Sequence, residues 1–213
     1  MRIAIFTDQY LPNMSGMVTS IINLRHGLEA LGHEVYIVAP ATRGHKETDD
    51  HIIRVFAVDP RVFLGNVMAI PTKGILRKLI NMDFDVIHVQ EMFTMGALGH
   101  AVAKRTGCPL VETVHTQWDM LFKHYPTTVL AAAVGIGIGF PIYFGFRNTL
   151  PIYLLEHGDE KSALSRQFGR NLVVFANECD LVIAPSQHVL DKLKRFRCKT
   201  ETVHIPNAIN ITP

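Results

Sequence analysis

A histidine followed by polar and aromatic side chains stands at the end of a strongly apolar run. His115 follows Leu110–Val114 and precedes Thr116, Gln117 and Trp118. Imidazole changes charge near physiological pH. Hydroxyl, amide and indole groups are suited to hydrogen bonding and stacking against a bound ligand. The cluster predicts an acceptor-binding site for a sugar ring or another polar group, with His115 as the candidate catalytic residue.

A serine–glycine pair forms a second candidate site. Ser15 and Gly16 directly precede a helix-like stretch, where free backbone amides and the positive end of a helix dipole attract anions. Gly16 has no side chain and would let a phosphate approach closely. An N-cap serine beside a loop glycine explains the same pair. The loop lacks a G-x-G-x-x-G pattern, so a nicotinamide or flavin cofactor is not expected.

Two further polar residues accompany the apolar run Val86–Val89. Glu91 lies where that run ends and is a candidate acceptor-binding residue, although a carboxylate near a helix N-terminus explains it equally well. His88 lies inside the run and is interpreted as a core histidine with a hydrogen-bond partner.

Short, β-branched apolar runs recur along the chain and predict buried strands. They are Ile3–Phe6, Val35–Ala39, Ile53–Val58, Val86–Val89, Leu110–Val114, Leu181–Ala184 and Val203–Ile205. Helical stretches separate most of them. The first has an apolar stripe at Val18, Ile21, Ile22, Leu24, Leu28 and Leu31, and Gly32 follows as a stop signal.

This alternation predicts an α/β fold, a Rossmann-like doubly wound parallel sheet. The connection between Val35–Ala39 and Ile53–Val58 is polar and is not expected to be helical. Ligands of such sheets bind beyond the carboxyl ends of the strands. A lone histidine is more often structural, but the position of His115 at this edge favours a functional role.

Composition narrows the class of protein. The 213 residues carry a net charge of +2, too little to argue for a nucleic-acid partner. The three cysteines form no CxxC pair, which predicts neither a disulfide framework nor a zinc site. The first apolar stretch is too short for a signal peptide. We expect a cytoplasmic protein that needs no metal and no cofactor.

An uncharged stretch, Val129–Phe146, approaches the length of a membrane-spanning helix. A crossing there would separate strands that the fold needs in one sheet. A buried helix and a lipid-facing surface segment therefore both stay open. Basic residues cluster later in the chain, where they either meet anionic headgroups or form a solvated helix end: Lys192, Lys194, Arg195, Arg197 and Lys199. Peripheral contact with the inner face of the cell membrane is a hypothesis based on these two features.

The loops and strands together resemble the retaining GT-B glycosyltransferases of family 4, and more narrowly their diacylglycerol glucosyltransferase branch. Several individually weak motifs occur in the family's order. They are Ile3–Pro12, Ser15–Ser20, Leu31–Val35, Asp85–Gly96, Pro109–Thr116, Lys123–Tyr125, Ala184–Ser186 and Ile205–Asn210.

The resemblance implies a metal-independent transfer of a hexose with retention. The donor would be a nucleotide sugar, expected to be UDP-glucose, and the acceptor a lipid such as diacylglycerol. Ser15 and Gly16 would lie near the donor diphosphate, whose developing charge backbone amides can stabilise. His115 would line the acceptor side near the transferred sugar.

Residues 1–213 are accordingly expected to form one N-terminal, acceptor-side domain of a GT-B enzyme. The C-terminal domain that binds the nucleotide sugar is expected to be absent, so the chain alone should be inactive. Two rival functions stay open. One is a family 4 enzyme with a soluble acceptor, and the second is a non-catalytic Rossmann-like module that binds a lipid or an anion.

Overall fold

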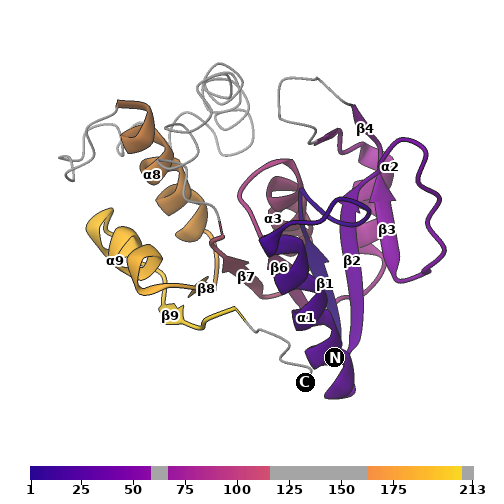
Figure 1. Ribbon diagram of the computed structural model, residues 1–213, viewed down its shortest axis with the longest axis horizontal. Coiled ribbons are helices and arrows are strands. Elements are labelled where there is room, and N and C mark those ends of the chain that lie inside the picture. Colours follow the sequence, from indigo (N-terminus) through magenta and orange to yellow (C-terminus); the bar gives the residue numbers. More distant parts are fainter. Residues whose placement is uncertain (59–66, 116–162, 208–213) are drawn as a thin grey trace.

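The computed structural model describes residues 1–58, 67–115 and 163–207, and the side chains of the helix that begins at Ala163 from residue 169 onward. The described elements alternate between strands and helices for most of the chain (Figure 1). They are β1 (Arg2–Phe6), α1 (Gly16–Ala30), β2 (Glu34–Pro40), β3 (Ile52–Val55), β4 (Ala57–Val58), β5 (Met68–Ala69), α2 (Lys73–Ile80), β6 (Val86–Val89), α3 (Thr94–Thr106), β7 (Leu110–Thr113), α8 (Ala163–Ala176), β8 (Leu181–Ala184), α9 (Gln187–Arg195) and β9 (Thr202–His204).

The main sheet has seven strands in the order β3-β2-β1-β6-β7-β8-β9. Every neighbouring pair in it is parallel. The order runs outward in both directions from the β1–β6 pair, which is the switch point where ligands of such sheets bind. The α/β, Rossmann-like fold expected from the sequence is confirmed.

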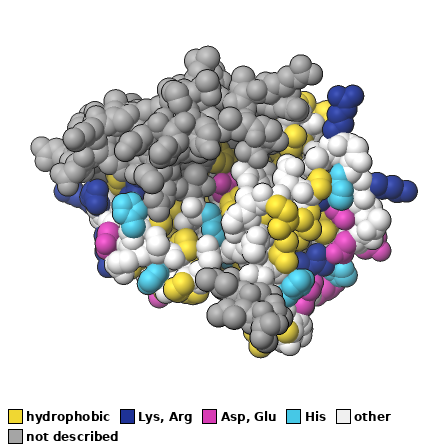
Figure 2. Space-filling view, in the orientation of Figure 1, with side chains coloured by type: hydrophobic (Ala, Val, Ile, Leu, Met, Phe, Trp, Pro, Cys, Tyr) yellow, Lys and Arg dark blue, Asp and Glu magenta, His cyan; other side chains and the backbone are white. Residues whose placement is uncertain are grey.

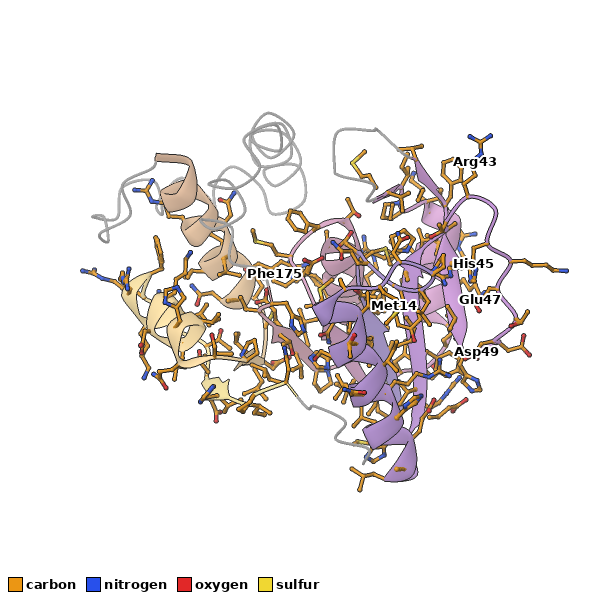
Figure 3. All side chains as sticks on the ribbon, viewed as in Figure 1. Met14, Arg43, His45, Glu47, Asp49 and Phe175 are labelled. Carbon is orange, nitrogen blue, oxygen red and sulfur yellow. The ribbon has the colours of Figure 1, made fainter. Side chains whose placement is uncertain are left out.

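Helices cover the sheet in two layers (Figure 1). On one face, α1 packs over β1 and β2 through Val18 and Ile21, which join Ile3, Ile5 and Ile37 in one apolar cluster. On the other face, a larger cluster joins the sheet to α2, α3, α8 and α9. Phe175 of α8 is fully buried in it, and Figure 3 shows its position in the molecule. Burial on both faces explains the continuous apolar runs of β1, β2 and β6, whose residues are mostly buried.

The ends of α1 follow from local sequence. The Ser15 side chain accepts a hydrogen bond from the Val18 amide and caps the helix. The helix ends at Ala30, and Gly32 adopts a left-handed φ of 81°, which glycine reaches without steric cost. The predicted stop at Gly32 is confirmed.

The prediction of one strand over residues 53–58 is wrong in part. β3 ends at Val55, and β4 begins two residues later in a separate two-stranded sheet, where it pairs antiparallel with β5. Phe56 lies between the two strands and is exposed, because the chain leaves the main sheet there. The polar connection between β2 and β3 contains no helix, as expected.

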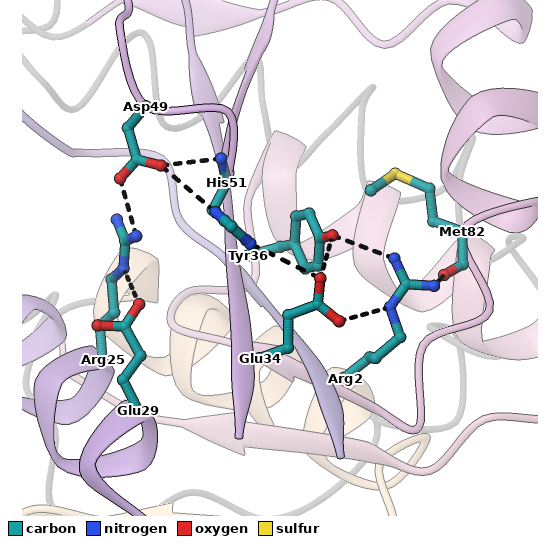
Figure 4. Close-up of polar contacts among 8 residues, drawn as sticks. All are labelled: Arg2, Arg25, Glu29, Glu34, Tyr36, Asp49, His51 and Met82. Atoms are coloured by element: carbon teal, nitrogen blue, oxygen red, sulfur yellow. Dashed lines mark hydrogen bonds and ion pairs between the residues drawn. The ribbon is translucent and has the colours of Figure 1, made fainter. Parts of the chain in front are cut away.

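A polar network ties the amino ends of β1 and β2 together (Figure 4). Arg2 donates from Nε to Glu34 Oε2 at 3.0 Å and from Nη2 to the Tyr36 hydroxyl at 3.1 Å. That hydroxyl donates to Glu34 Oε1 at 2.6 Å. The backbone amide of Arg2 donates to Asp85 Oδ2 at 2.6 Å, just before β6. This edge is therefore occupied by structural contacts, and the opposite edge carries the candidate site.

The predicted basic cluster is corrected at one position. Lys192 on α9 is only 7% exposed, so it belongs to neither a solvated nor a lipid-facing surface. Within the described residues, no helix is long and apolar enough to cross a membrane. The segment Val129–Phe146 lies outside the described residues.

Candidate active site

The carboxyl edge of the sheet brings together residues from β6 and β7 that are distant in sequence. His115 follows β7, and Gln90 follows β6. The His115 Nε2 atom lies 2.8 Å from Gln90 Oε1. The backbone amide of Gln90 donates to the Phe6 carbonyl at the end of β1 at 2.9 Å. Gln90 therefore lies at the switch point, and the hydrogen bond between Gln90 and His115 places the His115 ring there too.

His115 is a neutral ring at physiological pH. Burial lowers its pKa to about 4, because an apolar environment disfavours the imidazolium. A carbonyl oxygen only accepts hydrogen bonds, so Nε2 carries the proton and donates to Gln90. The Nδ1 atom is left with a lone pair and serves as a hydrogen-bond acceptor.

His88 is a core residue, as predicted from its place inside β6. Its Nε2 atom lies 2.7 Å from Thr113 Oγ1 on β7, and the ring is buried. Burial lowers its pKa to about 4, and the nearby His115 adds to the effect. Two neutral side-chain hydrogen bonds thus join β6 to β7, one in the core and one at the edge.

The Ser15–Gly16 pair forms the start of α1, with Ser15 as N-cap and Gly16 as the first helical residue, so both interpretations of it can be compared. Ser15 is the N-cap, and its hydroxyl lies 3.3 Å from the Val18 amide. Within the described residues, the backbone amides of Gly16 and Met17 have no acceptor, as expected for the first turn of a helix. Gly16 is exposed, and a Cβ there would meet nothing within 4 Å. An anion therefore has room to reach these amides.

Arg54 on β3 holds the loop that precedes α1, a role not predicted from the sequence. Its Nη2 atom donates to the Leu11 carbonyl at 2.7 Å, and Nη1 donates to the Pro40 carbonyl at 3.1 Å. It also pairs with Glu47 at 2.8 Å, and its guanidinium lies over the Tyr10 ring. An arginine inside an otherwise apolar strand was the available signal, because a charge there needs partners.

Asp8 links the same loop to α3. Its Oδ1 atom accepts hydrogen bonds from the Thr94 hydroxyl at 2.7 Å and from the Met95 amide at 3.2 Å. Burial raises the pKa of Asp8 to about 6, and these two hydrogen bonds oppose the effect. The N-cap residue of α3, Phe93, makes no side-chain capping bond. Asp8 supplies the carboxylate at this helix N-terminus.

The remaining residues predicted to bind the acceptor are only partly placed by the structure. Glu91 lies at the carboxyl edge, as expected, with 9% of its surface exposed. Asp8 also places a carboxylate at the N-terminus of α3, so the two interpretations of Glu91 stay open. Thr116, Gln117 and Trp118 lie outside the described residues. Within the residues that are described, no three His, Cys, Asp or Glu side chains form a group suited to a metal.

Comparisons with known proteins point to one family of glycosyltransferases. The family model described as Glycosyltransferase Family 4 matches residues 14–212. The chain is 32% identical to an alpha-monoglucosyldiacylglycerol synthase from Acholeplasma laidlawii over 100% of its own length. It is 30% identical to a synthase of the same name from Streptococcus pneumoniae over 99% of its length. It is also 30% identical to a GDP-mannose-dependent alpha-mannosyltransferase from Mycobacterium tuberculosis, over 62% of its length and 37% of that protein.

The fold is shared with a solved structure. A sucrose-phosphate synthase chain from Thermosynechococcus elongatus superposes with a TM-score of 0.51, covering 99% of this chain and 91% of that one at 15% identity. The present chain spans 48% of the Acholeplasma synthase and 41% of the Streptococcus synthase. It thus corresponds to less than half of each.

Proposed function

The chain belongs to Glycosyltransferase Family 4, and from this premise we propose that it is the acceptor-side half of a glucosyltransferase acting on diacylglycerol. The observation that carries the proposal is the 32% identity, over 100% of the chain, to an alpha-monoglucosyldiacylglycerol synthase. The site geometry is compatible with it. A neutral histidine and a helix N-terminus both lie at the ligand-binding edge of the sheet, and within the described residues the first two amides of that helix have no acceptor.

In the proposed reaction, the acceptor hydroxyl oxygen bonds to the anomeric carbon of UDP-glucose as the bond from that carbon to the diphosphate breaks, with retention of configuration. The hydroxyl proton passes to a phosphate oxygen of the departing UDP. His115 offers Nδ1 as an acceptor for a sugar hydroxyl and stays uncharged, since burial lowers its pKa to about 4. The amides of Gly16 and Met17 stabilise the negative charge that develops on the leaving diphosphate. Donors fixed in advance at a helix terminus serve this purpose without a metal ion.

We further propose that a second domain completes the donor site. The chain spans 48% of the Acholeplasma synthase, and the nucleotide would be bound by a region equivalent to that relative's remaining part. The exposed side chains at the carboxyl edge would then face this domain. We expect the isolated chain to transfer no sugar, and measurable turnover by it would contradict this division of roles.

A membrane surface is the proposed place of the reaction, because a water-soluble donor and a lipid acceptor meet there. The loop before α1 presents Met14, which is 65% exposed. Figure 2 shows hydrophobic side chains gathered on the surface where Figure 3 labels Met14. An apolar patch beside the site suits a lipid acceptor. Flotation with anionic liposomes tests this, and failure to float would argue against membrane contact.

A second candidate function is mannosyl transfer from GDP-mannose. It is favoured by the 30% identity to the mannosyltransferase from Mycobacterium tuberculosis. Two more functions compete with glucosyl transfer to a lipid: transfer to a soluble acceptor, and binding of a lipid or an anion without catalysis.

Product analysis with the full-length gene product separates these four functions. UDP-glucose and GDP-mannose would each be offered with diacylglycerol in mixed micelles and, separately, with soluble glycans. We expect an α-linked glucosyl lipid from UDP-glucose alone, identified by mass and by the anomeric coupling in its NMR spectrum. A mannosylated product, a soluble product or a β-linkage would contradict the proposal. Binding of these ligands without any turnover would favour a non-catalytic module.

A further inference from the structure

We propose that Gln90 is a positioning residue of this site, which holds the His115 ring in one orientation and with its proton on Nε2. The inference rests on the proposed function, in which Nδ1 of His115 faces the transferred sugar. Gln90 itself is not assigned a contact with substrate. It acts through the histidine.

The position of Gln90 is fixed more firmly than that of an ordinary surface glutamine. Its side chain is 1% exposed. Its backbone amide donates to the Phe6 carbonyl at 2.9 Å, which ties the end of β6 to β1. β7 pairs with β6 in a parallel register that includes Val89 opposite Glu112. The two strands thus set the separation between Gln90 and His115, and the side-chain contact closes at 2.8 Å.

The Gln90 amide is not explained by folding stability alone. Its Nε2 atom is buried and has no hydrogen-bond partner within the described residues. A buried donor without a partner is unfavourable, and an apolar side chain of similar shape would avoid this penalty. Among the described residues, His115 is the one hydrogen-bond partner of this side-chain amide, so control of this ring is the role that its geometry supports.

Among the described residues, Gln90 is the hydrogen-bond partner of the His115 ring, and burial is the cause of the lowered His115 pKa. His88 on β6 is the neighbouring titratable group, and it is neutral and bonded to Thr113. On the loop after β1, Asp8 directs its carboxylate to Thr94 and Met95 of α3. Glu112 directly precedes Thr113 on β7. Neighbouring residues of a strand face opposite sides of the sheet, so Glu112 lies on the face opposite to Thr113 and its partner His88. Within the described residues, no carboxylate is hydrogen-bonded to His115.

Nitrogen-resolved NMR of the histidine side chains tests the proposal on this chain without any need for catalysis. The His115 signals would be assigned from their loss in His115→Asn. We expect protonated Nε2 and unprotonated Nδ1 in the wild type. A proton on Nδ1 would overturn the proposal, whatever the behaviour of any Gln90 variant.

The isosteric variant Gln90→Glu supplies a second readout. A carboxylate in the same place favours the imidazolium, so the His115 titration midpoint should rise by about 1–3 pH units. Gln187→Glu is the matched control, because Gln187 is exposed on α9 and pairs with Asp191. It should leave His115 unchanged. A folded Gln90→Glu protein with an unshifted His115 midpoint would overturn the proposal.

The transfer assay distinguishes positioning from mere packing. In the full-length enzyme, Gln90→Glu should lose activity as the pH falls through the raised His115 midpoint, whereas the wild type and Gln187→Glu should not. A Gln90→Glu rate without this added pH dependence would overturn the positioning role. A wild-type enzyme that transfers no sugar would instead refute the proposed function, while the NMR result would still stand.

Discussion

At the scale of single residues, burial moves several titratable side chains toward their neutral forms. The pKa values of His88 and His115 fall to about 4, and that of Glu112 rises to about 8. Burial is the largest cause in each case. These three side chains are therefore uncharged at neutral pH, whereas Asp8, with a pKa of about 6, is mostly ionised.

Glu112 offers a direct test of how burial raises the pKa of a carboxyl group in this fold. It is 0% exposed, and neither carboxyl oxygen has a hydrogen-bond partner within the described residues. Its folded pKa of about 8 lies above the ordinary 4.5. The folded protein should therefore lose stability as the pH rises from about 4.5 through 8. Glu112→Met removes this loss and should raise the free energy of unfolding by about 1–3 kcal/mol even at low pH.

Urea unfolding at pH 5, 7 and 8.5 measures the effect of Glu112. The advantage of Glu112→Met over the wild type should widen with each step in pH. Glu112→Gln keeps a polar group without the charge, so its unfolding free energy should diverge from the wild type over the same range. An advantage of the Met variant that is constant with pH would contradict the raised pKa.

Asp8 provides a second residue-scale prediction. Asp8→Ala removes the cap of α3 and should cost about 0.5–2 kcal/mol. Asp8→Asn keeps an oxygen for the Thr94 hydroxyl and the Met95 amide. Burial raises the Asp8 pKa from 3.8 to about 6, so wild-type stability should fall as the pH rises through that window. Thermal unfolding should show Asp8→Asn equal to the wild type at pH 3.5 and more stable at pH 7.5, and the reverse order would be inconsistent with this cause.

Candidate site residues could be predicted from the sequence where the residue type alone suggests a chemical role. His115 was singled out because a histidine at a strand end is conspicuous, and the structure places it in contact with Gln90 at the switch point; its functional role stays a prediction. Gln90 and Arg54 were missed. Their importance depends on the contacts they make with residues elsewhere in the chain, to His115 and to Leu11 respectively. Residue type does not reveal such contacts.

At the scale of elements, close packing of α3 against β6 fixes the backbone beside the site. A Cβ added at Gly96 would lie 2.0 Å from the Glu91 carbonyl oxygen, which no small shift relieves. At Gly99, the nearest atom would be Val89 Cγ1 at 2.7 Å. These glycines let α3 lie directly on β6, the strand that leads into Gln90 and Glu91.

Gly96→Ala should therefore destabilise the fold by about 1–3 kcal/mol or more, as overpacked cores do. Gly27→Ala on α1 is the matched control, since a Cβ there meets nothing within 4 Å. That substitution should be stabilising by about 0.5–1 kcal/mol, because alanine favours helix more than glycine does. Chemical denaturation of both variants measures the two effects. Equal stabilities would mean that the close contact at Gly96 can relax.

Elements were predictable in proportion to their length and burial. Five of the predicted apolar runs, each of four or more residues, overlap β1, β2, β6, β7 and β8. The two-residue strands β4 and β5 carry no periodic signal of their own. The run from Ile53 to Val58 therefore looked continuous, although the chain changes sheets at Phe56.

At the scale of the whole molecule, the two edges of the sheet have different roles. The amino edge is held by the network around Arg2, Glu34 and Tyr36 (Figure 4). The carboxyl edge holds the loop before α1 and the His115–Gln90 pair. Alternating strands and helices predicted this parallel arrangement. The spatial order of the strands, which brings β6 beside both β1 and β7, was established only by the structure.

The turnover of His115→Ala in the full-length enzyme tests most directly the claim that this edge is a glycosyl-transfer site. With UDP-glucose and diacylglycerol, kcat/KM should fall by roughly 10- to 100-fold, as expected when one buried hydrogen bond to the reacting sugar is lost. His26→Ala, at an exposed position on α1, should transfer glucose at the wild-type rate. Wild-type turnover by a folded His115→Ala enzyme would contradict the account.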